Sequence, residues 1–249
     1  MTPRFHAPAA RATGEVIALP EEEAAHLTRV LRLEVGDAVR VFDGRGQEFD
    51  AVVSVVDRHH VEVRLGDSRT PARESRVTMT LVQSVLKADK MDAVVRDAVM
   101  LGVVDIQPLV SGRVEVTRPA LTRARRQERW QRIAVSSAKQ CGRAVVPRVL
   151  DAIDFDGLVA GLASKTLPVP AMMFVEPHAR AGVAKIADLR LRDDGSATVI
   201  IGPEGGWAET EIERVAPMAI LVTLGGRTLR ADAAAVVALS ALQTILGEF

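Results

Sequence analysis

The sequence lacks the features that mark secreted and membrane proteins. It contains a single cysteine, Cys141, among 249 residues, which excludes an intramolecular disulfide. No stretch approaches the roughly 20 uninterrupted apolar residues that a membrane-spanning helix needs, because charges interrupt every hydrophobic segment. The first ten residues also lack the apolar run of a signal peptide. We therefore expect a soluble, cytoplasmic protein without a membrane partner.

Motifs for metals and for phosphates are missing as well. Neither the Lys-Ser/Thr ending of a P-loop nor the glycine spacing of a dinucleotide fingerprint occurs. Cys141 has no partnered histidine that would mark it as a nucleophile, so a structural or pocket-lining role is expected. No metal site is expected, because no histidine is joined to cysteine or carboxylates at metal-ligand spacing. The histidines are His6, His26, His59, His60 and His178.

A net charge is also absent, since 32 basic residues balance 32 acidic ones. This balance argues against nucleic-acid binding, which depends on Lys and Arg that release counterions from phosphates. The balance is uneven along the chain, however. Between Arg113 and Arg148 there are ten basic residues and only Glu115 and Glu128 as acids, a net charge of plus eight. This segment favours an RNA-facing patch, although a solvated helix face in an Arg-rich chain is an alternative reading.

The first part of the chain has the pattern of a small β unit. Short Val-rich runs cover residues 39–42, 48–56 and 60–65, and Asp43-Gly44-Arg45-Gly46 has turn chemistry. A helix is predicted over 21–33, where Ala24, Leu27, Val30 and Leu31 recur at helical spacing. Residues 67–71 read as a linker.

From residue 76 onward the pattern changes to alternating strands and helices. Strands are predicted at 77–82, 103–106, 171–175, 197–201 and 220–224, and helices at 89–101, 122–140 and 231–246. Such alternation predicts an α/β domain with a parallel sheet.

Two glycine-bearing loops follow predicted strands in this second part. The first is Gly202-Pro203-Glu204-Gly205-Gly206 and the second runs from Leu224 to Asp232. Glycines at the carboxyl ends of parallel strands let the backbone approach a ligand closely, so the two loops together predict one binding site. Taken singly, the first loop is equally a tight turn, Arg230 an ordinary surface residue and Asp232 a helix cap.

The sequence resembles the RsmE family of 16S ribosomal RNA uridine N3-methyltransferases, in the SPOUT superfamily, nearly end to end. The resemblance rests on His26-Leu27 through Val30-Leu31-Arg32, Phe42-Asp43-Gly44, Gln83 to Lys90, Glu128-Arg129-Trp130, Gln140-Cys141-Gly142-Arg143 with Pro147, and the two glycine loops. It implies a PUA-like RNA-binding β-barrel over residues 1–70. It further implies a SPOUT α/β methyltransferase domain over 75–249 with a carboxyl-terminal trefoil knot, and a homodimer.

The same resemblance implies a cofactor and site residues. The cofactor is S-adenosyl-L-methionine, and its pocket is assigned to Gly202, Pro203, Glu204, Gly205, Gly206, Leu224, Gly225 and Leu229. The partner that it implies is 16S ribosomal RNA in the small subunit. We expect contacts from Arg32 and, on the charge of the basic segment, from Arg125, Arg126 and Arg129. Arg143 is the first and Arg230 the second candidate for holding the uracil oxygens while N3 loses its proton, because guanidinium donors stabilise that developing charge. The general base is left open among Glu204, Asp232 and water.

The chain departs from the family pattern in the second loop. Where the family usually has Leu-Arg-Thr-Glu-Thr-Ala, this chain has Leu229-Arg230-Ala231-Asp232-Ala233-Ala234, so two hydroxyls are lost and the carboxylate is shorter. Gly226 replaces the usual proline and should loosen the turn. These changes keep two alternatives open. One is a non-catalytic RNA-binding or ribosome-assembly protein that retains the fold, and the other is a metabolic nucleotide-binding enzyme, which the basic segment disfavours.

Overall fold

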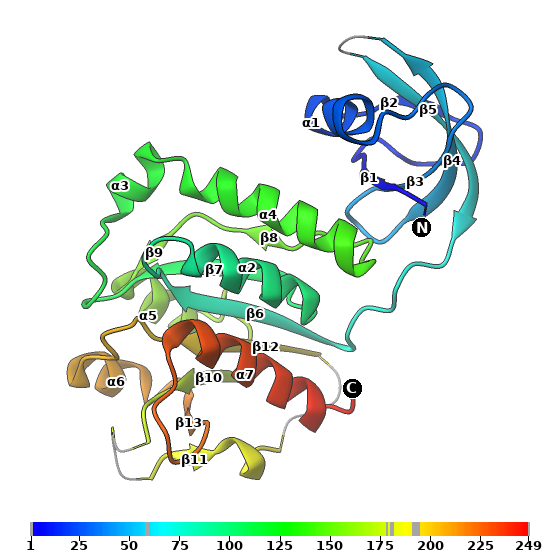
Figure 1. The fold of residues 1–249 in the computed structure, drawn as a ribbon. Helices are drawn as coiled ribbons and strands as arrows, with labels where there is room; N and C mark the ends of the chain where they lie inside the picture. Colours follow the sequence, from blue (N-terminus) through cyan, green and yellow to red (C-terminus); the bar gives the residue numbers. More distant parts are fainter. Residues whose placement is uncertain (1, 58–59, 178, 180–181, 191–194, 249) are drawn as a thin grey trace. The chain divides into compact units, whose positions relative to one another are not determined.

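The computed structural model describes residues 2–57, 60–177, 179, 182–190 and 195–248, which form two compact units (Figure 1). The first unit is Met1–Glu74 with Val135–Val146, and the second is Ser75–Ala134 with Pro147–Phe249. Val135–Val146 therefore makes its contacts with the first unit, although residues of the second unit precede and follow it in the chain. His59 and His178 lie outside the described residues.

The first unit contains a five-stranded sheet in the order β1-β3-β4-β5-β2. Only β1 and β3 are parallel, and the other neighbours are antiparallel. The predicted strands were right in position, and two three-residue strands near the amino terminus were missed. The strands are β1 (Arg4–His6), β2 (Val16–Ala18), β3 (Ala38–Phe42), β4 (Glu48–Val56) and β5 (Val61–Arg69).

Alternation along these strands builds the core of the first unit. Val61, Val63 and Leu65 of β5 are buried while Arg64 between them is exposed, as expected for a sheet with one covered face. The predicted helix over 21–33 is in fact the α-helix α1 (Glu21–Ala25) continued by the π-helix η1 (His26–Leu31). Leu27 of η1 is fully buried in the core.

The second unit contains an eight-stranded sheet whose main path is β11-β13-β10-β12-β6-β7-β8, with β9 also paired to β7. Every pairing is parallel, which confirms the parallel sheet predicted from the alternating pattern. The strands are β6 (Val77–Ser84), β7 (Asp105–Val110), β8 (Arg148–Val149), β9 (Ile153–Asp154), β10 (Ala171–Phe174), β11 (Ala184–Lys185), β12 (Gly195–Ile201) and β13 (Ile220–Thr223).

The helices of the second unit include the closely packed pair α2 and α7, which lie side by side in Figure 1. One helix, α4, has its first half in the second unit and its last residues in the first. No helix among the described residues is long and apolar enough for a membrane span. The helices are α2 (Lys90–Met100), α3 (Arg118–Arg123), α4 (Arg126–Cys141), α5 (Phe155–Ala163), α6 (Glu209–Val215), α7 (Ala231–Ile245) and the 3₁₀ turn η2 (Ile186–Asp188).

Two sequence predictions were wrong in their boundaries. The predicted linker over 67–71 overlaps β5, which continues to Arg69 because Glu48 and Phe49 of β4 pair with its end. The helix predicted over 122–140 is two helices, α3 and α4, and Arg125 between them has a left-handed backbone with φ of 49°. A residue with a side chain rarely adopts this conformation, so no sequence pattern marked the break.

Candidate functional site

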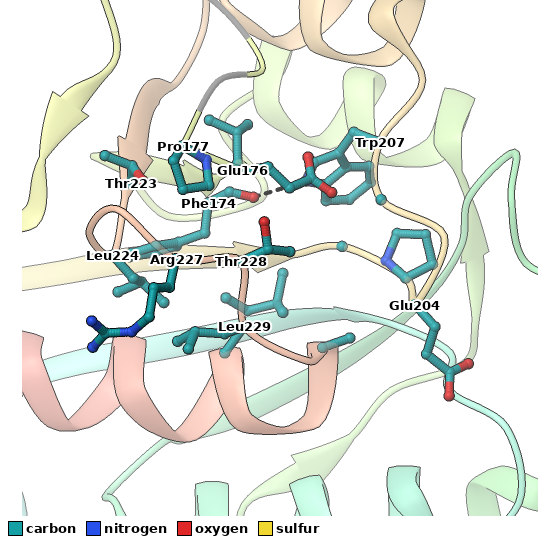
Figure 2. A pocket seen from close by; sticks show the side chains of 17 residues that line it. Phe174, Glu176, Pro177, Glu204, Trp207, Thr223, Leu224, Arg227, Thr228 and Leu229 are labelled. Atoms are coloured by element: carbon teal, nitrogen blue, oxygen red, sulfur yellow. Dashed lines mark hydrogen bonds between the residues drawn. The ribbon is translucent and has the colours of Figure 1, made fainter.

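A pocket lies at the carboxyl edge of the parallel sheet in the second unit, where β10, β12 and β13 end (Figure 2). Both predicted glycine loops contribute to it, together with the segment after β10. The lining residues are Phe174, Val175, Glu176, Pro177, Ile201, Gly202, Pro203, Glu204, Gly206, Trp207, Thr223, Leu224, Arg227, Thr228, Leu229, Ala231 and Ala234.

Trp207 fixes the first glycine loop to the neighbouring strand. Its indole Nε1 donates a hydrogen bond of 2.9 Å to the carbonyl oxygen of Phe174 in β10. The buried ring lies so close to Gly202 that a Cβ atom there would be 3.0 Å from the indole. A side chain at position 202 would therefore force the buried indole of Trp207 to shift, and its absence leaves the loop backbone at the pocket wall.

Gly206 has a different structural reason for being glycine. Its φ of 69° lies in the left-handed region, and a Cβ atom on it would collide with the carboxylate of Glu176. The side chain of Glu176 therefore occupies the space that the glycine leaves free. This close approach connects the first glycine loop to the segment after β10.

Six of the eight residues predicted to hold the cofactor line this one pocket, and two do not. Gly205 lies against Arg113, whose Nη1 donates a 2.7 Å hydrogen bond to the Gly205 carbonyl oxygen. Gly225 is exposed in the second loop. The six are Gly202, Pro203, Glu204, Gly206, Leu224 and Leu229.

Glu204 lines the pocket rim but directs its carboxylate elsewhere. Figure 2 shows this carboxylate pointing away from Thr228 and Leu229. It forms an ion pair with the ammonium of Lys90 and accepts a 3.4 Å hydrogen bond from the backbone N–H of Lys87. The hydrogen bond from Lys90 is the main cause that lowers the pKa of Glu204. A carboxylate held in its ionised form by a cation is a weak proton acceptor.

A buried carboxylate, that of Glu211, holds the backbone that follows this loop. Glu211 in α6 accepts hydrogen bonds from the backbone N–H groups of Gly112, at 2.8 Å, and Ala208, at 2.9 Å. Gly112 and Arg113 follow β7, so the loop after β7 is bonded directly to Gly205 through Arg113, and the Glu211 carboxylate bridges Gly112 and Ala208. These contacts give the pocket wall a fixed backbone.

Arg230 is exposed just before α7 and pairs with Asp232, Nη2 to Oδ2 at 3.2 Å. It is not a lining residue, but its neighbours Leu229 and Ala231 are. The two alanines that depart from the family pattern differ in setting: Ala231 lines the pocket, whereas Ala233 is exposed.

Arg143 belongs to the first compact unit, whereas the pocket belongs to the second. The residue is 5% exposed, and its Nε lies 3.1 Å and 3.0 Å from the two carboxylate oxygens of Glu74. Its Nη2 also donates to Glu74, at 2.5 Å. The guanidinium therefore has a carboxylate partner inside the protein.

The basic segment is partly neutralised by acids of its surroundings. Arg125 pairs with Glu128 at 2.9 Å. Arg129 pairs with the buried Asp92, which also accepts a 3.1 Å hydrogen bond from the indole of Trp130. Arg126 is the first residue of α4. Arg32 follows η1 and has a left-handed backbone with φ of 55°. Among the described residues, neither side chain has a hydrogen-bond or ion-pair partner.

The sequence analysis did not identify the lining residues that follow β10, nor the two aromatic lining residues Phe174 and Trp207. Glu176 was passed over because no glycine or charge cluster marks its segment, although it follows a correctly predicted strand. The rule that ligands bind at the carboxyl ends of parallel strands applies to β10 as much as to β12. Three lining residues that were not assigned to the pocket from the sequence, Arg227, Thr228 and Ala231, lie within the predicted second loop. The lining residues outside both predicted loops are, besides Glu176, Phe174, Val175, Pro177, Ile201, Trp207, Thr223 and Ala234.

No group of three or more His, Cys, Asp or Glu side chains with the arrangement of a metal site occurs among the described residues. The expectation that no metal is bound stays a prediction.

Two family models match the chain. One, described as an RNA methyltransferase domain, matches residues 73–243, and the other, an RNA methyltransferase PUA domain, matches residues 19–66. Among curated proteins, Ribosomal RNA small subunit methyltransferase E of Bacillus subtilis is 27% identical over 89% of this chain and 87% of its own length. The protein of the same name from Synechocystis is 29% identical over 92% of this chain and 73% of its own length.

Solved structures are similar over the whole chain. The crystal structure of Ribosomal RNA small subunit methyltransferase E from Neisseria gonorrhoeae bound to S-adenosyl methionine has a TM-score of 0.86 and 33% identity. A methyltransferase from Legionella pneumophila in complex with the same cofactor has a TM-score of 0.88 and 29% identity. In both comparisons, 98% of each chain is covered.

Proposed function

Since the chain belongs to the RsmE family of S-adenosylmethionine-dependent ribosomal RNA methyltransferases, we propose that it methylates N3 of a specific uridine in 16S ribosomal RNA. The family model covers residues 73–243, and relatives named as small-subunit methyltransferases match most of the chain. The non-catalytic alternative is not favoured, because the pocket retains the glycine loops despite the two alanine replacements. The proposed substrate context is the small ribosomal subunit.

The observation that carries this proposal is the pocket at the sheet edge. Its walls are loop backbone at Gly202 and Gly206, and its apolar side chains include Leu224 and Leu229. This surface fits an adenosine moiety, which needs apolar contact for the base and polar backbone groups for its edges. The cofactor carries no phosphate, so the absence of a P-loop lysine agrees with it. The residues present therefore fit S-adenosylmethionine.

When bound, the cofactor supplies an electrophilic methyl group for in-line displacement. The task of the chain is to hold the acceptor nitrogen in line, and the bracing of the first loop by Trp207, Glu211 and Arg113 supports such positioning. The uracil N3–H must also lose its proton, and a cation near the uracil oxygens lowers the cost of that loss.

We propose Arg230 as the better candidate for this cation. It is exposed and lies between the lining residues Leu229 and Ala231, and it pairs with Asp232 in the first turn of α7. Arg143 remains the second candidate by resemblance alone, because its guanidinium is engaged by Glu74 and the pair would have to open. The base is proposed to be Asp232 or water, since Lys90 lowers the pKa of Glu204.

Of the four arginines expected at the RNA, we propose Arg32 and Arg126 as the direct contacts, because Arg125 and Arg129 would first have to leave their ion pairs with Glu128 and Asp92. The proposed domains are a PUA-like domain over residues 1–70 and a catalytic domain over 75–249. The match of a PUA family model to residues 19–66 supports this division. We also propose a homodimer and a cytoplasmic location. The α7 helix has no charged residue after Asp232 and exposes Val237 and Ile245, which supports an apolar interface.

The experiment that tests the function is transfer of a labelled methyl group. Small ribosomal subunits from a strain that lacks the enzyme should accept label from S-adenosylmethionine in stoichiometric amount, whereas large subunits should not. Binding of the cofactor without any transfer to ribosomal RNA would instead support the non-catalytic reading.

A further inference from the structure

Glu176 is an acidic side chain of the pocket that lacks a partner. It follows β10 and is half-buried, and among the described residues its carboxylate has no hydrogen bond or ion pair. The other acid of the lining, Glu204, is held by Lys90 and points away (Figure 2). The pocket therefore presents one free carboxylate to whatever it binds.

The fold makes room for this carboxylate. A side chain at Gly206 would collide with it, so the glycine, with its left-handed φ of 69°, leaves the space in which the carboxylate sits. Arg227, the cationic residue of the lining, lies on the opposite side of the pocket in Figure 2 and forms no pair with Glu176. The carboxylate is thus available to accept hydrogen bonds from a ligand.

A carboxylate can only accept hydrogen bonds, and a nucleoside offers two adjacent donors in its ribose 2′- and 3′-hydroxyls. Acidic residues near a glycine loop at a strand end bind ribose in this way in dinucleotide folds. A position beside the sulfonium is less suitable. A negative charge there would stabilise the cationic donor more than the transition state, in which that charge is dispersed, and would slow transfer.

We propose that Glu176 binds the ribose hydroxyls of the cofactor and makes the pocket selective for ribonucleosides over deoxynucleosides. This inference rests on the proposed function, because it assumes that the pocket holds S-adenosylmethionine. It assigns the cofactor contact of the segment after β10, which the sequence did not identify.

The test measures affinity by calorimetry for S-adenosylmethionine, S-adenosylhomocysteine, 5′-methylthioadenosine and 2′-deoxy-5′-methylthioadenosine. Glu176→Ala should weaken binding of the three ribose ligands alike, by about tenfold or more, the amount expected for a charge-assisted hydrogen bond. It should also abolish the preference for methylthioadenosine over its deoxy counterpart. Glu176→Gln keeps one acceptor oxygen and should lose less.

The matched control is Glu213→Gln, which removes one exposed carboxylate from α6 outside the pocket and should leave every affinity unchanged. Loss of affinity for S-adenosylmethionine alone would mean that Glu176 senses positive charge, and would overturn the proposal. Unchanged affinities in Glu176→Ala would overturn it as well. Failure of the wild-type protein to bind S-adenosylmethionine would instead contradict the proposed function.

Discussion

Gly205 and Gly206 are adjacent in one loop, yet their surroundings predict different effects of substitution. Gly206 has a left-handed backbone and faces the Glu176 carboxylate, whereas a Cβ atom on Gly205 would make ordinary contact with Arg113 at 3.4 Å. Gly206→Ala should weaken cofactor binding by about tenfold or more, because the added Cβ would push the flexible Glu176 side chain out of its place and the left-handed backbone would add strain of about 1–3 kcal/mol. Gly205→Ala should bind normally.

Calorimetric titration with S-adenosylmethionine checks this difference. The Glu176→Ala background provides a further control, because removing the carboxylate should make Gly206→Ala less harmful while the strain remains. If Gly205→Ala and Gly206→Ala lose the same affinity for S-adenosylmethionine, neither the left-handed φ of Gly206 nor its contact with Glu176 explains the effect of substitution in this loop.

The roles of Arg230 and Arg143 can also be distinguished by comparing the effects of replacing each with alanine. Arg230→Ala should lower the single-turnover rate of methyl transfer about 10²- to 10³-fold, the usual effect of losing one donor to a developing anion, and should not change stability. Arg143→Ala should lower the free energy of unfolding by about 1–3 kcal/mol, because it leaves the Glu74 carboxylate without its partner.

Denaturant unfolding measures the stability of each variant, and single-turnover methylation with saturating cofactor and RNA measures its rate of transfer. Together they distinguish a catalytic role from a structural one. If Arg143→Ala is as stable as the wild type and slow in transfer, Arg143 is the uracil-binding residue and the present preference for Arg230 is wrong.

The sequence located the glycine loops but could not assign each residue within them. Gly206 faces the carboxylate of Glu176, and Gly205 lies against Arg113. Both neighbours are far from the loop in the sequence. Local sequence contains no information on which glycine of a pair faces a ligand. The presence of a ligand-facing glycine loop was therefore predictable, but which of the two glycines has a structural need to be glycine was not.

At the scale of elements, the ion pairs of α4 change which arginines should bind RNA. Arg129 is engaged by the buried Asp92, whereas Arg126 and Arg123 of α3 have no side-chain partner among the described residues. Replacing Arg123 and Arg126 together by Gln should lower the slope of log affinity against log salt by about 1.4–1.8, if each contacts a phosphate. Arg129→Gln should instead reduce stability.

Binding of a ribosomal RNA fragment at several salt concentrations measures this slope. The double variant Lys185→Gln and Arg190→Gln removes the same charge from exposed positions at and after β11, and should leave the slope unchanged. An unchanged slope in the Arg123 and Arg126 variant would identify the segment as a solvated face.

Elements with a strong periodic pattern were predicted well, and those defined by distant pairing were not. The apolar run of β12 and the long helix α7 lie close to their predicted positions. The short strands β1 and β2 were missed because three residues contain too little pattern, and they are strands only through pairing with β3 and β5. The break before α4 depends on one left-handed residue, Arg125.

At the scale of the whole molecule, stability should depend on pH through His6 in the first unit. Burial is the main cause that lowers its pKa, and the charges of Lys139 and Arg45 add to this effect while Asp43 opposes it. The unfolded chain therefore takes up a proton near pH 6.5 that the folded chain resists. The free energy of unfolding should fall as the pH decreases below about 6.5, until the folded state is protonated too.

Urea unfolding between pH 8 and pH 5 measures this dependence. His26, whose pKa is also lowered by burial, contributes in the same direction, so His6→Asn should reduce the pH dependence without removing it. An identical dependence in wild type and variant would contradict the role of His6.

The sequence resemblance also predicted features of the whole molecule that remain predictions. Strand order and pairing do not define how the chain threads through its own loops, so the trefoil knot is not established by the parallel sheet. The homodimer likewise depends on a second chain. The family and the cofactor pocket could be predicted because their motifs lie in continuous stretches, whereas threading and assembly depend on the complete backbone.

The most direct test of the account is to identify the product. The protein is incubated with isotopically labelled S-adenosylmethionine and small subunits from a strain that lacks the enzyme, and the digested 16S ribosomal RNA is mapped by mass spectrometry. The account predicts label in a single nucleoside, 3-methyluridine, at one position. Label on the ribose, on another base or at many positions, or no label despite cofactor binding, would contradict it.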